Sequence, residues 1–175
     1  MKSRTKQLTL FSLFAALTAI LSQISIPLPF TPVPINLATL SVLLSGAILG
    51  KKGGAISQIV YAILGAVGLP VYANFLSGIG ILIGPTGGYI IGYIIAAFVV
   101  GIIVEKSEKN LGTYLLSMCL GIIACYILRT AWFMYITNNN LISALTLCVL
   151  PFIPGDIIKI IFGAFIANRL KKIRI

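Results

Sequence analysis

Long apolar stretches, separated by short polar or proline- and glycine-rich breaks, fill almost the whole chain. Six of them are long enough, or nearly so, to cross a bilayer as α-helices, which takes about 20 residues. They cover residues 8–26, 35–49, 55–69, 88–104, 111–136 and 154–170. The second and third are short for a hydrocarbon core about 30 Å thick. We therefore expect the outer-side loops beside them to dip into the membrane, where other parts of the protein must cover their backbone.

Residues 141–150 form a further apolar stretch in front of the sixth span. A single helix over 141–170 would be about 45 Å long at 1.5 Å per residue, too long to cross a membrane without steep tilt. Because Pro151 and Pro154 interrupt it, we predict a short outer helix, a break and then the sixth span. At the other end, the first stretch follows basic residues as a signal peptide would. It is about nineteen residues long with no small-residue cleavage site before the prolines, so we expect a retained first helix.

Composition agrees with an integral membrane protein. Of 175 residues, 59% are hydrophobic and 9% are charged, and the mean hydropathy is +1.09. A soluble domain carries about a quarter charged residues. We therefore predict one all-α membrane domain over residues 1–175. The chain has no histidine, and its three cysteines form no CxxC pair, so we expect no metal, no disulfide and no cofactor.

The charges predict the orientation. Eleven of the thirteen Lys and Arg residues lie in four connections, residues 1–7, 50–54, 105–110 and 169–175. No charged residue of either sign lies in the alternate connections, residues 27–34, 70–87 and 137–153. This asymmetry predicts six spans with both termini cytoplasmic, in a multi-pass protein of a prokaryotic plasma membrane. The net charge of +10 is thereby explained without a nucleic-acid partner.

Three charged residues remain inside predicted spans. Arg129 lies about 27 Å from the inner end of its helix, counted from Leu111 at 1.5 Å per residue. Asp156 and Lys159 lie about 21 and 17 Å from the inner end of theirs, counted back from Leu170. All three thus fall in the outer half of the bilayer, where a charge costs several kcal/mol and usually serves a function. Asp156 and Lys159, three residues apart, share one helix face and can contact each other or one ligand.

Proline- or glycine-rich breaks precede the three spans that begin on the outer side, and helix N-termini favour anions. Arg129, Lys159 and Asp156 together carry a formal charge of +1, which complements a small monoanion. The candidate binding residues are Asp156, Lys159, Arg129, Tyr89, Thr86, Gly87, Phe30, Asn36 and Trp132. Two alternatives are a purely structural Asp156–Lys159 pair and an Arg129 that extends outward to water. Outer-side aromatic residues are individually more typical of a membrane-interface belt than of a cage: Phe30, Tyr72, Phe75, Tyr89, Trp132 and Tyr135.

Enzymatic signatures are absent. The run from Gly46 to Lys52 resembles a P-loop but is one residue short and lacks the final Ser or Thr. Without histidine or a second intramembrane carboxylate, Lys159 is the only candidate base, which leaves an intramembrane enzyme as a weak alternative.

Four segments carry a resemblance to a known family: Pro29-Phe30-Thr31-Pro32-Val33-Pro34-Ile35, Gly68-Leu69-Pro70-Val71, Gly84-Pro85-Thr86-Gly87-Gly88-Tyr89 and Phe152-Ile153-Pro154-Gly155-Asp156-x-x-Lys159. In this order they resemble the BioY family, biotin-binding S-components of energy-coupling factor (ECF) transporters. The likeness runs from the first span to the last.

The resemblance implies a six-helix S-component-like bundle with a ligand pocket near the outer surface, in which Asp156 and Lys159 are pocket residues and the loop after the first helix is a lid. It implies that Ala15 and Ala19 contact a transmembrane T-component and that two ABC-type ATPases supply energy in trans. Biotin would pair its carboxylate with a base and donate its ureido N–H groups to Asp156. An S-component for another small anionic vitamin is the alternative.

The chain departs from the family pattern at two positions. Some relatives carry an Arg directly after Gly-Gly-Tyr, where this chain has Ile90. At the position of Arg129, members of the family usually have a small residue. Arg129 either replaces the missing cation or is unrelated to it, so the partner of a ligand carboxylate stays open at this point.

Overall fold

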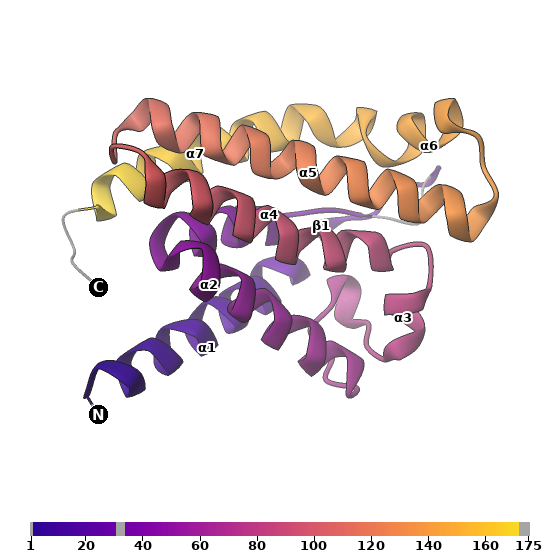
Figure 1. The fold of residues 1–175 in the computed structure, drawn as a ribbon. Coiled ribbons are helices and arrows are strands. Elements are labelled where there is room, and N and C mark those ends of the chain that lie inside the picture. Colours follow the sequence, from indigo (N-terminus) through magenta and orange to yellow (C-terminus); the bar gives the residue numbers. More distant parts are fainter. Residues whose placement is uncertain (1, 31–33, 172–175) are drawn as a thin grey trace.

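The computed structural model describes residues 2–30 and 34–171, which form a bundle of helices with one short β-ribbon (Figure 1). The helices are α1 (Lys2–Gln23), α2 (Ala38–Ala66), α3 (Ile79–Ile83), α4 (Gly87–Lys106), α5 (Leu111–Thr137), α6 (Leu141–Cys148) and α7 (Ile153–Leu170). Single 3-10 turns cover Ala73–Phe75 and Leu150–Phe152, and the strands are β1 (Ser25–Ile26) and β2 (Ile35–Asn36). Four described segments are long and apolar enough to cross a membrane: Arg4–Gln23, Gly87–Lys106, Leu111–Thr137 and Leu141–Leu170.

Helix α2 reverses direction at Gly50, where φ is 77° and ψ is −178°, a conformation that favours glycine. On a straight helix Ser45 and Gln58 would be about 20 Å apart, yet the Gln58 amide donates to the Ser45 hydroxyl at 3.2 Å. A Cβ on Gly54 would lie 2.8 Å from the Cα of Gly46. The two arms, residues 38–49 and 51–66, therefore fold back on each other. They correspond to the second and third predicted spans, so all six predicted spans are present as helices.

The connection between the first two spans differs from the prediction. Helix α1 ends at Gln23 rather than at residue 26, and α2 begins at Ala38 rather than at residue 35. Ser25 and Ile26 instead pair antiparallel with Asn36 and Ile35. Isoleucine suits a strand as well as a buried helix, so the apolar pattern could not reveal this short ribbon. The predicted lid, residues 27–34, lies partly outside the described residues, which omit 31–33.

The predicted break before the last span is confirmed. Asn140 accepts a hydrogen bond from the Ser143 N–H at 2.8 Å and caps α6. After Cys148 the chain makes the 3-10 turn at Leu150–Phe152 and restarts as α7, with Pro154 in its first turn, where its missing N–H leaves no helical hydrogen bond unmade.

Small residues let α4 approach both of its neighbours closely. A Cβ on Gly92 would lie 2.8 Å from the Cys125 sulfur of α5, and Gly101 lies directly against the backbone of Lys51 at the turn of α2. Around these contacts Leu43 and Met118 are fully buried. Helix α4 is thus held between α2 and α5, which fixes how its side chains face the interior.

The basic connections gather at one end of the bundle. Lys51 forms an ion pair with Glu105 at 3.3 Å, and the Lys171 ammonium donates to the Lys109 carbonyl at 3.3 Å. The turn of α2, the α4–α5 loop and the end of α7 therefore lie together, and α1 begins at the same end (Figure 1). We call this the basic end. Its facing the cytoplasm stays a prediction from the charges.

Candidate ligand cavity

A cavity of about 670 Å³, part of it open to solvent, lies among residues from β2, α2, α3, α4, α5, α7 and the segment between α2 and α3. Ligand sites typically combine apolar walls with a few polar groups. The lining residues are Pro34, Asn36, Thr39, Tyr61, Tyr72, Ala73, Asn74, Leu76, Ile81, Thr86, Tyr89, Ile90, Tyr93, Arg129, Phe152 and Lys159. Its lining suits a small molecule with an apolar body.

Asp156 and Lys159 form a buried ion pair at the start of α7. The Lys159 ammonium donates to Asp156 Oδ1 at 2.9 Å, and the Tyr126 hydroxyl donates to Oδ2 at 2.7 Å. The two residues are only 3% and 5% exposed. Lys159 lines the cavity and Asp156 does not. The carboxylate thus lies behind the ammonium, and an ammonium has two further N–H donors with which to meet a ligand.

Arg129 enters the cavity from α5 and is 4% exposed. Its guanidinium carbon lies 4.0 Å from the ring centroid of Tyr126, 4.6 Å from that of Tyr89 and 4.7 Å from that of Phe152. Ring faces attract cations, so these rings hold the side chain in place. This burial rules out the alternative in which Arg129 extends outward to water.

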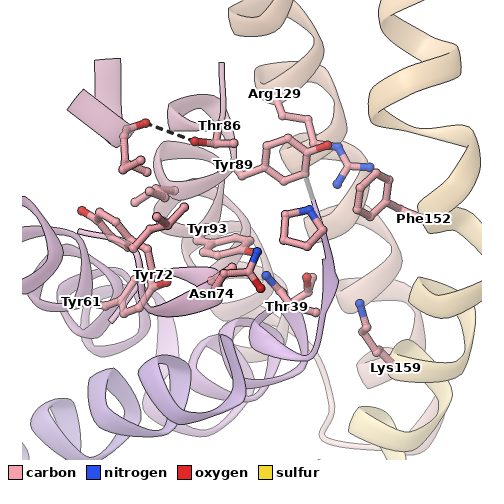
Figure 2. A pocket seen from close by; sticks show the side chains of 16 residues that line it. Thr39, Tyr61, Tyr72, Asn74, Thr86, Tyr89, Tyr93, Arg129, Phe152 and Lys159 are labelled. Carbon is pink, nitrogen blue, oxygen red and sulfur yellow. Dashed lines mark hydrogen bonds between the residues drawn. The ribbon is translucent and has the colours of Figure 1, made fainter. Parts of the chain in front are cut away.

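Aromatic rings form much of the remaining wall. Tyr61 and Tyr72 meet edge to face at a centroid distance of 5.6 Å. Figure 2 shows this pair on one side of the cavity, Arg129 and Lys159 on the other, and Tyr93 between them. Burial raises the pKa of Tyr72 to about 12, so its hydroxyl stays protonated and donates to the Ala62 carbonyl at 2.7 Å. The cavity therefore has a charged side and an uncharged aromatic side.

The wall segment that contains Tyr72 is fastened to the end of α1. The Gln23 amide donates to the carbonyls of Val71 and Tyr72 at 3.2 and 3.0 Å, and its oxygen accepts from the Phe75 N–H at 2.9 Å. Both Asn74 and Phe75 have positive φ angles, 58° and 57°, a conformation that costs about 1–3 kcal/mol for such residues. Gln23 thus stabilises a strained loop that forms part of the cavity.

Five of the nine predicted binding residues lie in the cavity wall: Asn36, Thr86, Tyr89, Arg129 and Lys159. The depth estimates placed Arg129 and Lys159 in the same half of the bilayer, and the structure places both side chains in the cavity wall. Whether these five residues contact a ligand stays a prediction.

The other four do not line the cavity. Asp156 lies behind Lys159, and Phe30 is 57% exposed. Trp132 donates to the Gly84 carbonyl at 2.9 Å and so anchors the turn before α4. Gly87 lies directly against the backbone of Leu82, which allows α3 and α4 to meet. These contacts give Trp132 and Gly87 a role in shaping the turn.

The interface-belt interpretation is wrong for two of its six aromatic residues. Tyr72 and Tyr89 are 2% and 6% exposed and face the cavity, whereas Phe75 and Tyr135 are 69% and 79% exposed. Tyr61 and Tyr93 were missed altogether. Their position in the sequence could have indicated them. A tyrosine in the middle of a span needs a polar neighbour for its hydroxyl, which lipid does not provide.

The structure does not place Ala15 on a surface. Ala15 is 1% exposed and packs with Ala38 and Val42 of α2, while Ala19 is partly buried in the same cluster. In this structure the pair therefore serves packing within the bundle. Its contact with a partner protein stays a prediction.

The bundle and its cavity define a class: a multi-span helical membrane protein with a cavity, lined by aromatic and charged side chains, near the end opposite its basic connections. The BioY family model matches residues 1–174. The "Biotin transporter BioY" of Thermotoga maritima is 41% identical over 173 residues, which cover 97% of this chain and 98% of that protein. The "Probable biotin transporter BioY" of Pyrococcus horikoshii is 40% identical over 168 residues, covering 96% and 98%.

A solved structure agrees with these relatives. The S-component for biotin from an ECF-type ABC transporter superposes with a TM-score of 0.89 at 32% identity, covering 98% of this chain and 93% of that one. The chain belongs to the BioY family.

Proposed function

We propose that this protein is the substrate-binding membrane subunit, or S-component, of a biotin importer. The single observation that carries the proposal is the cavity, in which a buried arginine and lysine face an aromatic wall. Relatives named as biotin transporters match nearly the full length. Biotin offers one carboxylate, a hydrogen-bonding ureido ring and an apolar body. The lining offers cations for the first, polar side chains for the second and aromatic rings for the third.

The chain's own residues divide the task of binding. Lys159 keeps N–H groups for the ligand because Asp156 occupies only one of them, and Tyr126 holds the carboxylate of Asp156 in place. The rings of Tyr61, Tyr72 and Tyr93 would pack against the apolar body of biotin and exclude water. Asp156 therefore acts as a positioning residue rather than as a contact for the ureido group.

Energy would come from other subunits. We include in the proposal a transmembrane T-component and two ABC-type ATPases, because this chain lacks a complete P-loop. The proposal places both termini on the cytoplasmic side of the plasma membrane, so that the cavity opens toward the outside.

The test is ligand-dependent stabilisation of the purified chain in detergent. A ligand at 100 times its Kd adds about 2.7 kcal/mol to the stability of the native state. Biotin should raise the melting temperature, and Lys159→Ala should reduce the rise, whereas Lys51→Ala at the basic end should preserve it. A rise with a different vitamin and none with biotin would support the alternative S-component. No rise with any vitamin would contradict a binding function.

A further inference from the structure

Two of the three guanidinium nitrogens of Arg129 are buried and have no hydrogen-bond acceptor among the described residues. Its Nε and Nη2 atoms make no hydrogen bond to any described residue and are shielded from solvent. Arginine has five N–H donors and stays charged at any relevant pH. A buried charge that lacks hydrogen bonds is costly, so this side chain is held ready for a partner that the described residues do not supply.

The aromatic neighbours do not fill that need. Tyr89, Tyr126 and Phe152 surround the guanidinium at 4.0–4.7 Å. Their faces attract the cation but offer no strong acceptor for its N–H groups. The Tyr126 hydroxyl is already engaged with Asp156.

No side-chain carboxylate of the chain is free to neutralise Arg129. The chain has three acidic residues, Glu105, Glu108 and Asp156. Glu105 lies eighteen residues along α4 from Gly87, about 27 Å away at the basic end, and Glu108 lies beyond it. Asp156 accepts from Lys159 and from Tyr126 through its two oxygens. The buried group of Arg129, Lys159 and Asp156 therefore carries one uncompensated positive charge.

We propose that Arg129 is the residue that binds the ligand's carboxylate and that it makes the cavity selective for acids over the corresponding neutral amides. This inference rests on the proposed binding function and specifies which cation meets the charge. Lys159 is locally neutralised by Asp156, so the excess charge resides on Arg129. The planar guanidinium matches a carboxylate with two parallel hydrogen bonds, and the surrounding rings hold it while the cavity is empty.

The test compares each acid with its own amide. Dissociation constants for biotin and biotinamide are measured by calorimetry on the full chain in detergent. Leaving one member of a buried charge pair unpartnered costs roughly 30-fold or more in affinity, so the wild type should prefer biotin by about that factor. Arg129→Met should bind both within about threefold of each other. A wild type without the preference would overturn the proposal before any variant is made.

A matched variant separates Arg129 from Lys159. Asp156→Asn combined with Lys159→Met removes the internal pair as a unit and leaves the same net charge of +1. It should keep the ratio of biotin to biotinamide affinity, whatever happens to each affinity alone. Loss of the ratio in this variant, together with its retention in Arg129→Met, would assign the carboxylate to Lys159 and overturn the proposal.

The proposed function can fail separately. If wild type binds neither biotin nor biotinamide, the biotin assignment is wrong, and the pairs lipoate and lipoamide or nicotinate and nicotinamide are measured in the same way. The role of Arg129 is then tested with whichever acid binds, by the ratio of acid to amide affinity in wild type and in Arg129→Met. If no acid binds better than its amide, a carboxylate-binding role for Arg129 is refuted as well.

Discussion

Replacing Asp156 with asparagine should destabilise the protein far more than removing the whole ion pair. Asp156 is 3% exposed and is the only side-chain carboxylate near Lys159 and Arg129. Asparagine keeps the shape but leaves two buried cations with no anion. Lys159 then loses a charged acceptor at 2.9 Å, and the Tyr126 hydroxyl loses one at 2.7 Å.

The size of the effect follows from burial. Breaking a buried ion pair by removing one partner costs about 3–5 kcal/mol, whereas replacing both by apolar groups of similar volume is often neutral or stabilising. The lost hydrogen bond from Tyr126 falls within that total, since contacts around one group do not add independently. In a chain of this length 1 kcal/mol shifts the melting temperature by about 2–4 °C. We therefore expect a loss on the order of 10 °C.

The assay is thermal unfolding in detergent without ligand, for four proteins: wild type, Asp156→Asn, Lys159→Met and the double variant. Lys159→Met leaves Asp156 with Arg129 nearby, so it should lose less than Asp156→Asn. The double variant should unfold close to wild type. If Asp156→Asn is as stable as the double variant, the buried pair carries no appreciable coupling, and the electrostatic account of this site is refuted.

Two further predictions concern the turn of α2 at the basic end and the wall segment of the cavity. Gly50→Ala should lower the free energy of unfolding by at least about 1 kcal/mol, because alanine is strained at a φ of 77°. Gly80→Ala on α3, where a Cβ meets nothing within 4 Å, should be neutral in the same unfolding experiment, and equal losses would contradict this reasoning. Gln23→Ala should release the wall segment and speed ligand dissociation by about tenfold, measured by displacement of a labelled ligand. Gln7→Ala, an exposed change on the same helix, should leave that rate unchanged. An unchanged rate in Gln23→Ala would show that the wall segment keeps its conformation without Gln23.

Much of the architecture followed from single-residue properties. Hydropathy located the six spans, because transfer from water to hydrocarbon is nearly additive along a helix. Helix length and two prolines located the break before α7. Helical rise then placed Arg129, Asp156 and Lys159 at one depth, and the structure joins the helices that carry them through Tyr126.

Single-residue properties could not predict which side chains of a helix point into the cavity, or which distant segments pack beside it. Whether Tyr89 faces lipid or the cavity depends on how α4 is rotated, and contacts such as Gly92 with Cys125 on another helix set that rotation. The wall segment around Tyr72 is held by Gln23, 49 residues earlier in the chain. Its place in the site is a non-local contact without a periodic signal.

The amino-acid sequence by itself determined the class of protein, the spans and the presence of three charges in an apolar interior. The tertiary structure alone decided that Asp156 accepts hydrogen bonds from Lys159 and Tyr126, while Nε and Nη2 of Arg129 find no acceptor among the described residues. Hydropathy and charge belong to each residue and add along the chain. A hydrogen bond requires two atoms to meet within about 3 Å, and only the packing of the whole bundle determines which atoms do.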